Sequence, residues 1–202
     1  MSALLLCGLY MAAAAQGTSI LGQLCAQMAD TAAVLDYSYT LTASGVKSLG
    51  NGILTVQDKS YVMQTSGLRI YCNATNIWVV DEAGKEIMID SVSQEDESFL
   101  SNPAQLLTNV SDVFSVSLPA SNGGMLTYKL VPKSDCGITS GSVTLDVSGK
   151  SPVFASGSFR TSDGGQLDIK IKSMTFMKKK PLTFYILDLS GFDSSWMITD
   201  LR

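Results

Sequence analysis

The chain has 202 residues and a hydrophobic content of 46%, which is enough for a sizeable buried core. Its net charge of −4 argues against nucleic acid as a partner, because nucleic-acid-binding domains normally carry a basic face. The absence of histidine excludes Ser-His-Asp and Cys-His catalytic systems and every metal site that needs an imidazole ligand.

Residues 1–16 form an apolar run that is too short to span a bilayer and that ends in small residues. This pattern is typical of a secretory signal peptide, although the basic residues that usually open one are missing. It predicts export with cleavage between Ala12 and Gln16. A lipid anchor on Cys7 is not expected, because a bacterial lipoprotein cysteine follows a small residue and Leu6 is large.

The four cysteines are far apart in the chain and include no CxxC pair, so neither a zinc site nor any other metal site is expected. They are Cys7, Cys25, Cys72 and Cys136. Their spacing leaves two interpretations open, namely one disulfide among them or four small buried hydrophobic residues. No motif for an organic cofactor is present either.

Apolar residues recur every three or four positions between Thr18 and Asp36, which predicts an amphipathic helix that packs on a sheet. Thr18 or Ser19 is a suitable cap for its start. The apolar stripe consists of Ile20, Leu21, Leu24, Met28, Ala32 and Leu35. The first strand is expected directly afterwards, over Tyr37–Ser44.

The stretch Leu49–Asp90 contains five short strand-like runs separated by turn residues. Each run alternates between apolar and more polar positions, which is typical of an antiparallel meander with one buried side. Around Ile77–Val80 both faces are apolar, so we expect another part of the chain to cover that region from outside.

A second helix is predicted to begin at Asn102, which suits the N-cap, with Pro103 at the first helical position and Gln105 completing a capping box. Apolar residues follow at helical spacing and end at Phe114. The acidic run Glu95–Glu97 before this helix is interpreted as a solvated loop, because adjacent carboxylates rarely face each other as a catalytic pair must.

Strand patterns return after Ser115. The predicted strands are Met125–Lys133, Ser142–Val147, Val153–Thr161, Leu167–Phe176 and Leu182–Leu189. Together with the earlier runs they make about eleven strands, and no linker divides the chain, so residues 17–202 are expected to form one domain. The run Met174–Pro181 contains three lysines and is either a solvated tip or a tip that docks a partner or an anionic membrane surface.

Several short motifs occur in a distinctive order along the chain. They are GILTVQ at residues 52–57, YVM at 61–63, NIW at 76–78, KEIMI at 85–89, SNPAQLL at 101–107 and WMITDLR at 196–202. In order and spacing these motifs resemble the periplasmic outer-membrane lipoprotein carrier proteins (LolA-like), and in particular their Bacteroidetes-type branch. The resemblance covers nearly the whole chain after residue 16.

The resemblance implies a mainly β fold, an incomplete antiparallel β-barrel whose hydrophobic concavity is closed by a helical lid. It also implies a periplasmic monomer that binds the acyl chains of lipoproteins. Such a carrier takes them from an inner-membrane transporter and hands them to an outer-membrane acceptor. The better-known carriers have an arginine latch where this chain has Asp58, and an Asp-Gly turn where it has Asn73-Ala74, so the resemblance supplies neither feature.

The expected cavity combines the apolar positions of the meander with those of the two helices. The predicted wall residues are Leu54, Val56, Tyr61, Met63, Ile70, Trp78, Val80, Ile87 and Ile89, and the predicted lid residues are Leu21, Leu24, Met28, Leu106, Leu107 and Val110. The same residues would also make an ordinary packed core, and residue types alone do not separate these two interpretations.

Two classes of function compete with the carrier. A lipid-sensing or protein-interaction module of the same fold, as in periplasmic stress sensors, is the alternative, although those sensors normally carry an additional domain. An enzyme is not expected, because the sequence has no nucleophile or phosphate-binding motif and no spaced pair of carboxylates.

Overall fold

The computed structural model describes residues 20–92 and 110–202. Four predictions lie outside these residues: the signal peptide over 1–16 with Cys7, the start of the first helix at Thr18, the acidic run Glu95–Glu97, and most of the helix that begins at Asn102. The described residues form a short helix over residues 20–30 and one large, mainly antiparallel sheet that curls around it.

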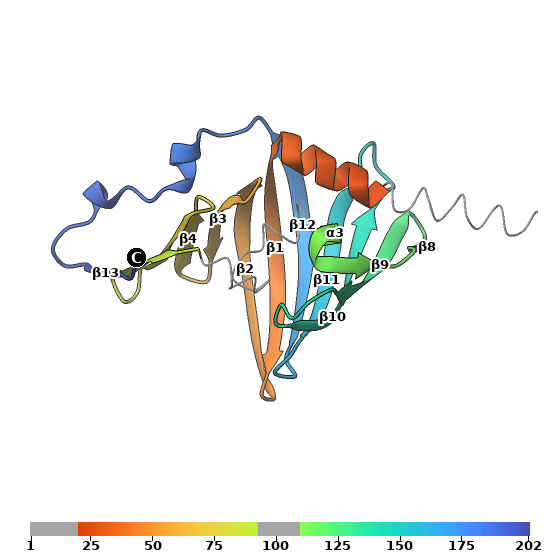
Figure 1. Ribbon diagram of the computed structural model, residues 1–202, viewed down its shortest axis with the longest axis horizontal. Coiled ribbons are helices and arrows are strands. Elements are labelled where there is room, and N and C mark those ends of the chain that lie inside the picture. The colour runs from red at the N-terminus through yellow and green to blue at the C-terminus, as the bar shows by residue number, and fades with distance from the viewer. Residues whose placement is uncertain (1–19, 93–109) are drawn as a thin grey trace, which may run out of the picture.

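The described strands belong to a single 13-stranded sheet in the order β13-β6-β5-β4-β3-β2-β1-β12-β11-β10-β9-β7, with β8 paired to β9. In chain order, the strands before residue 92 are β1 (Ala32–Ala43), β2 (Val46–Gln57), β3 (Ser60–Thr65), β4 (Leu68–Cys72), β5 (Asn76–Asp81) and β6 (Glu86–Ser91). The strands after residue 110 are β7 (Phe114–Val116), β8 (Ala120–Asn122), β9 (Met125–Pro132), β10 (Ile138–Asp146), β11 (Val153–Thr161), β12 (Gln166–Met177) and β13 (Met197–Asp200). In Figure 1 the helix lies across the upper ends of β1, β12 and β11, and the long hairpins taper towards the opposite end. The predicted class, an open and mainly β barrel-like sheet with a small helical part, is confirmed.

The first helix is shorter than predicted, because the chain becomes extended soon after Asp30. The hydroxyl of Thr31 donates to the backbone oxygen of Gln27 at 2.7 Å, at the helix end. From Ala32 onward β1 pairs with β2 on one side and β12 on the other, over almost its whole length. Two ladders satisfy far more backbone groups than six further helical residues would, so pairing overrides the helical period of this stretch.

The five runs predicted between residues 49 and 90 are confirmed as β2 to β6, each paired with its neighbour in sequence. The turns between them are tight. Asp58 adopts a positive φ of 51° between β2 and β3, and Ala74 a φ of 72° between β4 and β5. The side chain of Asn73 accepts hydrogen bonds from the backbone N–H groups of Thr75 and Asn76, so this turn forms without the Asp-Gly pair.

The predicted strand Leu182–Leu189 is wrong. The chain forms two 3-10 turns there, η1 (Leu182–Tyr185) and η2 (Leu189–Gly191), after Pro181 has removed one backbone donor. Phe114, predicted as helical, opens β7 after the short helix α3 (Val110–Val113). The count of thirteen strands exceeds the predicted eleven because β7, β8 and β13 are only three or four residues long.

Within the described ranges, no helix is both long enough and apolar enough to cross a membrane.

Candidate functional site

The face of the sheet that packs against the helix over residues 20–30 is called here the inner face. Its buried residues form one hydrophobic cluster that runs from β4 through β1 to β7. The cluster also contains the predicted lid residues Leu21, Leu24 and Met28, none more than 2% exposed, and Val110 of α3 at 1%. The other two predicted lid residues, Leu106 and Leu107, lie outside the described residues.

Five of the nine predicted wall residues lie together on this inner face. In an antiparallel pair, residues directly opposite each other share a face. Leu54 is opposite Met63 and Val56 is opposite Tyr61, while Met63 is also opposite Ile70 on β4. The same register places Cys72 and Ile77, which were not predicted as wall residues, beside them.

The other four predicted wall residues, Trp78, Val80, Ile87 and Ile89, lie on the opposite, outer face. Ile70 is paired with Val79, so Trp78 and Val80 point the other way, and they are paired in turn with Ile89 and Ile87. The prediction of one continuous wall is therefore wrong for β5 and β6. The run Ile77–Val80 is apolar on both faces, so alternation could not tell which face is inside.

The outer face of β5 and β6 is covered by the C-terminal segment, as the two-sided pattern predicted. Trp78, Val80, Ile87 and Ile89 form a second buried cluster with Leu187. Tyr71, Leu189, Phe192 and Trp196 pack around it, and the ring centroids of Phe192 and Trp196 lie 4.7 Å apart. β13 then adds to the edge of β6 as a parallel strand. These residues hold the C-terminal segment to the sheet and take no part in the inner face.

Burial of the inner face differs between the two halves of the sheet. On β9 to β11 the largest side chains are fully buried, with Tyr128 and Leu145 at 0% and Phe159 at 1% exposed. On β3 to β5, Met63, Ile70 and Ile77 are only partly buried. Strands β9–β11 are thus closed by protein side chains, whereas β3–β5 keep an apolar surface that is partly open. Leu167, Ile169 and Ile171 on the inner face of β12 are partly buried as well.

Aromatic rings lie over glycines on the inner face. A Cβ on Gly50 would come within 2.5 Å of the Tyr39 ring, and one on Gly141 within 2.6 Å of the Phe159 ring. A Cβ on Gly52 would meet a backbone oxygen at 2.3 Å and the Tyr37 hydroxyl at 2.7 Å. These glycines let large rings lie flat against the sheet, so aromatic side chains fill the inner face there.

Three titratable groups in the buried cluster of the inner face have raised pKa values. Burial raises the pKa of the Tyr61 and Tyr128 hydroxyls above their ordinary value, and burial likewise raises the pKa of the Cys25 thiol. Cys25, Cys72 and Cys136 are all unpaired, and the last two are buried, in keeping with the interpretation of these residues as small hydrophobic ones. Neutral side chains of this kind favour contact with apolar groups.

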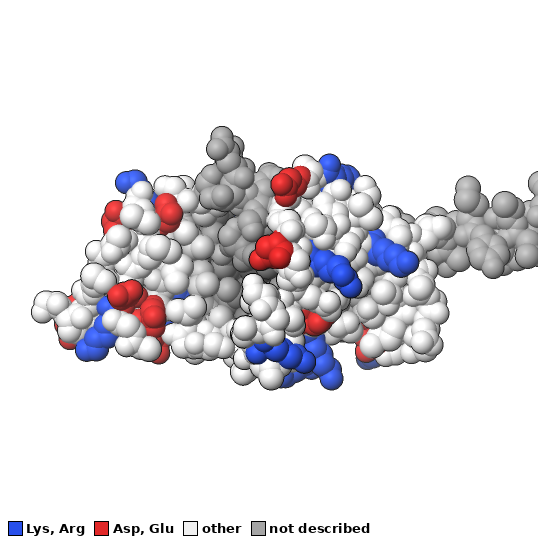
Figure 2. Space-filling model, turned by 90° about the horizontal axis from the view of Figure 1, so that it is seen from below, with Lys and Arg blue, Asp and Glu red and all other residues white. Residues whose placement is uncertain are grey.

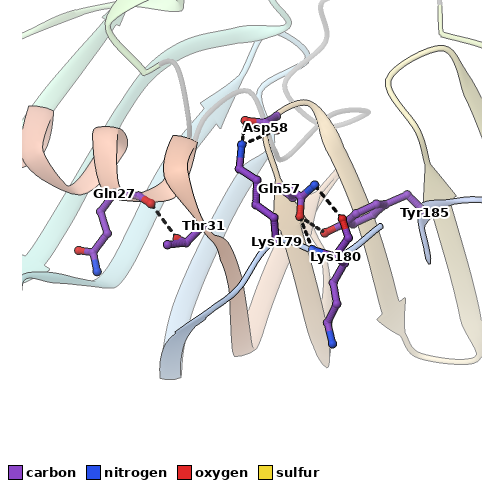
Figure 3. Close-up of polar contacts among 7 residues, drawn as sticks. All are labelled: Gln27, Thr31, Gln57, Asp58, Lys179, Lys180 and Tyr185. Atoms are coloured by element: carbon purple, nitrogen blue, oxygen red, sulfur yellow. Dashed lines mark hydrogen bonds and ion pairs between the residues drawn. The ribbon is translucent and has the colours of Figure 1, made fainter. Parts of the chain in front are cut away.

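A polar anchor joins the turn after β2 to the C-terminal segment (Figure 3). The backbone N–H of Lys180 donates to Gln57 Oε1 at 2.7 Å, and Gln57 Nε2 donates to the backbone oxygen of Lys180 at 3.2 Å. The Tyr185 hydroxyl donates to the same Gln57 oxygen at 3.4 Å. Asp58, which stands where the carriers have an arginine, pairs with Lys179 at 3.1 Å and so faces this segment. Sequence patterns did not indicate this anchor, because its partners lie more than 120 residues apart.

Charged side chains are sparse on the surface around the sheet. Figure 2 shows acidic and basic residues interspersed over the face seen from below, between wide areas that carry neither. A field of alternating sign does not steer a highly charged ligand.

No protein-family model matches the chain, and no curated protein matches its sequence. Among solved structures, an uncharacterized conserved protein from Thermus thermophilus is similar with a TM-score of 0.55 and 9% identity, over 92% of this chain and 99% of the other. A domain assigned to outer membrane lipoprotein sorting, from Vibrio parahaemolyticus, has a TM-score of 0.48 and 13% identity, over 85% and 97%. A LolA-superfamily protein from Nitrosomonas europaea has a TM-score of 0.46 and 11% identity, over 85% and 97%.

At such identities the likeness concerns the fold alone. The match to the Thermus protein extends over nearly the whole of both chains, so the architecture is shared as a whole. A LolA-superfamily protein is among these neighbours, and membership of that family and of its Bacteroidetes-type branch stays a prediction from the sequence. The chain thus has an open, mainly antiparallel sheet with a helix packed on its apolar inner face, an architecture that it shares with the Thermus protein.

Proposed function

We propose that this protein is a periplasmic carrier that binds the acyl chains of lipoproteins against the β3–β6 half of its inner face. The observation that carries the proposal is the partly open apolar surface around Met63, Ile70 and Ile77, in contrast to β9–β11, whose largest side chains are fully buried. Apolar surface that side chains leave partly uncovered on a rigid sheet is suited to a hydrocarbon ligand. The proposed activity is binding and transfer, without catalysis and without a cofactor.

The free energy of such binding is sufficient. Burial of one methylene contributes about 0.8 kcal/mol. About ten buried methylenes therefore supply roughly 8 kcal/mol, the binding free energy that corresponds to a micromolar dissociation constant. Hydrocarbon inside a bilayer is already out of water, so moving a chain from membrane to protein changes the free energy little. A site of this kind exchanges its ligand reversibly, as a carrier must.

A carrier of this kind requires a donor and an acceptor. In the proposed pathway residues 1–16 direct export and are removed, and residues 17–202 act as a monomer. The monomer receives acylated lipoproteins from an inner-membrane transporter and delivers them to an outer-membrane acceptor. The fold supports this assignment at the level of architecture, and the alternative, a lipid-sensing interaction module, is distinguished by experiment.

The test separates ligand binding from stability. Native mass spectrometry of the protein purified from its own periplasm should show a bound acylated species, and the purified protein should bind a fluorescent fatty acid. Met63→Gln should weaken fatty-acid binding about tenfold or more while thermal unfolding changes little, because Met63 is only partly buried.

The matched control is Gln64→Ala, which alters the exposed neighbour on the other face of β3 and should leave binding unchanged. If every variant that loses fatty-acid binding also unfolds, the inner face is a core and the carrier assignment fails. If a bound lipid neither exchanges nor transfers, the sensing module is the correct assignment.

A further inference from the structure

A corner of the molecule beside the end of β12 combines exposed lysines with exposed apolar side chains. Lys178 and Lys179 are exposed, and Lys180 is partly buried. In η1 and just after it, Leu182 is 65%, Phe184 41% and Ile186 41% exposed. Together with Lys59 in the turn after β2, these residues are called here the basic–apolar corner: Lys59, Lys178, Lys179, Lys180, Leu182, Phe184 and Ile186.

The exposure of the apolar side chains is imposed by the buried residues between them. Tyr185 is 0% and Leu187 8% exposed, and both turn towards the sheet. The anchor from Gln57 to the backbone of Lys180 and to the Tyr185 hydroxyl fixes the segment at this position (Figure 3). Phe184 and Ile186, which flank Tyr185, are therefore held pointing outwards, and no rearrangement is needed to present them.

The charge of the corner is opposite to that of the whole chain. Asp58 is paired with Lys179 at 3.1 Å, so the four lysines and this carboxylate together carry a net charge of +3. The complete chain has a net charge of −4. The Lys180 ammonium lies 5.6 Å from the centre of the Phe184 ring, which puts a cation at the border between the polar and the apolar part.

We propose that the basic–apolar corner docks on the surface of an anionic lipid bilayer. Leucine, phenylalanine and isoleucine side chains enter the boundary between headgroups and acyl chains, and lysines around them contact lipid phosphates. An acidic protein surface would complement the lysines but would gain nothing from three projecting apolar side chains unless it also had pockets for them. The contact is reversible, because three apolar side chains and a few lysines provide far less binding than a membrane-spanning helix.

This docking would orient the protein on the membrane. Met177, just before the corner, is paired with Ala32, two residues after the end of the helix over residues 20–30. Figure 1 shows the segment leaving β12 at the end of the sheet where that helix lies. Docking by the corner therefore brings the helix-covered end of the inner face towards the bilayer. The proposal goes beyond the acyl carrier function and does not depend on it.

Vesicle flotation of the purified mature protein tests the proposal. Vesicles of phosphatidylcholine alone are compared with vesicles that also contain about one-third phosphatidylglycerol. The protein should bind the anionic vesicles, and salt at about 0.5 M should weaken this binding strongly. Lys59→Gln with Lys178→Gln should lower binding about tenfold, as should Leu182→Ser with Phe184→Ser. Each of these side chains is exposed, so thermal unfolding should stay unchanged.

The matched control changes the hairpin between β1 and β2, at the tapered end, where Val46 and Leu49 are 66% and 74% exposed beside Lys47. Val46→Ser with Leu49→Ser should leave vesicle binding unchanged. The proposal is overturned if the protein ignores anionic vesicles, if folded corner variants bind like the original, or if the hairpin variant loses binding instead. It is also overturned if the corner variants lose only a protein partner. Met63→Gln should bind vesicles normally, so failure of the acyl site and failure of the corner are distinguishable.

Discussion

The two halves of the inner face have similar chemistry but differ in how completely side chains cover them. On β9 to β11, Tyr128, Leu145 and Phe159 are packed to complete burial. On β3 to β5, Met63, Ile70 and Ile77 keep part of their surface, and Met88, on the inner face of β6, is 42% exposed. Both halves are apolar, so composition does not mark the candidate site. Incomplete coverage marks it, and that property exists only in the folded chain.

A second contrast lies between the two faces of the β3–β6 half. On the inner face the apolar side chains are partly open, whereas on the outer face Val80 and Ile87 are buried under the C-terminal segment at 0% and 1% exposure. One set of strands therefore supports a candidate ligand surface on one side and a packed cluster on the other. Substitutions on the two sides should have different consequences.

The largest effect is expected in the closed half. Leu145→Ala removes a side chain that is fully buried, so it should lower the free energy of unfolding by about 2–5 kcal/mol. Urea unfolding measures the change. A loss below about 1 kcal/mol would mean that this half is loosely packed and that the contrast between the halves does not hold.

The outer cluster should respond next most strongly. Leu187→Ala should cost about 2 kcal/mol of stability, because Leu187 is 8% exposed and packs in a small cluster that can partly collapse. Fatty-acid affinity should stay the same, since this residue lies on the other face. A parallel loss of affinity would show that the outer cluster belongs to the ligand site.

Substitutions on the partly open inner face of β3–β5 should affect ligand binding more than stability. Ile70→Ala should cost about 1 kcal/mol of stability or less, since the side chain is only partly buried, while fatty-acid affinity falls about tenfold. Urea unfolding and fluorescence titration of the same sample give both numbers. If stability falls as it does for Leu145→Ala, the two halves are equivalent and both are core.

Tyr185→Phe tests the anchor of the C-terminal segment. Loss of the hydrogen bond to Gln57 should cost about 1 kcal/mol near pH 7. Burial raises the pKa of Tyr185 from 10 to about 12 in the folded protein. A raised pKa contributes stability that is fully present below pH 10 and is lost as the pH rises from 10 towards 12. Unfolding measured across this range should show a smaller alkaline loss in the variant, and an identical loss would exclude Tyr185 as a contributor.

The smallest effect should come from Asp58→Asn. Its partner Lys179 and Asp58 itself are 42% and 52% exposed, so water and salt screen the pair. The expected change in unfolding free energy is about 0.5 kcal/mol or less, and it should vanish in high salt. A larger change that persists in high salt would contradict this expectation. It would mean that Asp58 helps to hold the C-terminal segment in spite of its exposure.

Local patterns in the sequence determined much of this fold. Period-two alternation predicted β2 to β6 and all four strands from β9 to β12, because residues i and i+2 on a strand share a face whatever the tertiary context. Helical spacing identified Leu21, Leu24 and Met28 as buried. The apolar character of both faces around Ile77–Val80 correctly predicted an outer cover.

Only the tertiary structure decided which face of each strand is inside and where helix gives way to strand. The stretch after Asp30 fits a helical stripe, but two neighbouring ladders make it β1. Trp78 has apolar neighbours on both sides, so its face depends on pairing with Tyr71 and on the path of the C-terminal segment. Tertiary packing also decides whether an apolar side chain belongs to the packed core or to an open surface. A side chain such as Ile70 has the same chemistry in both places, and residues distant in the sequence determine how much of it is covered.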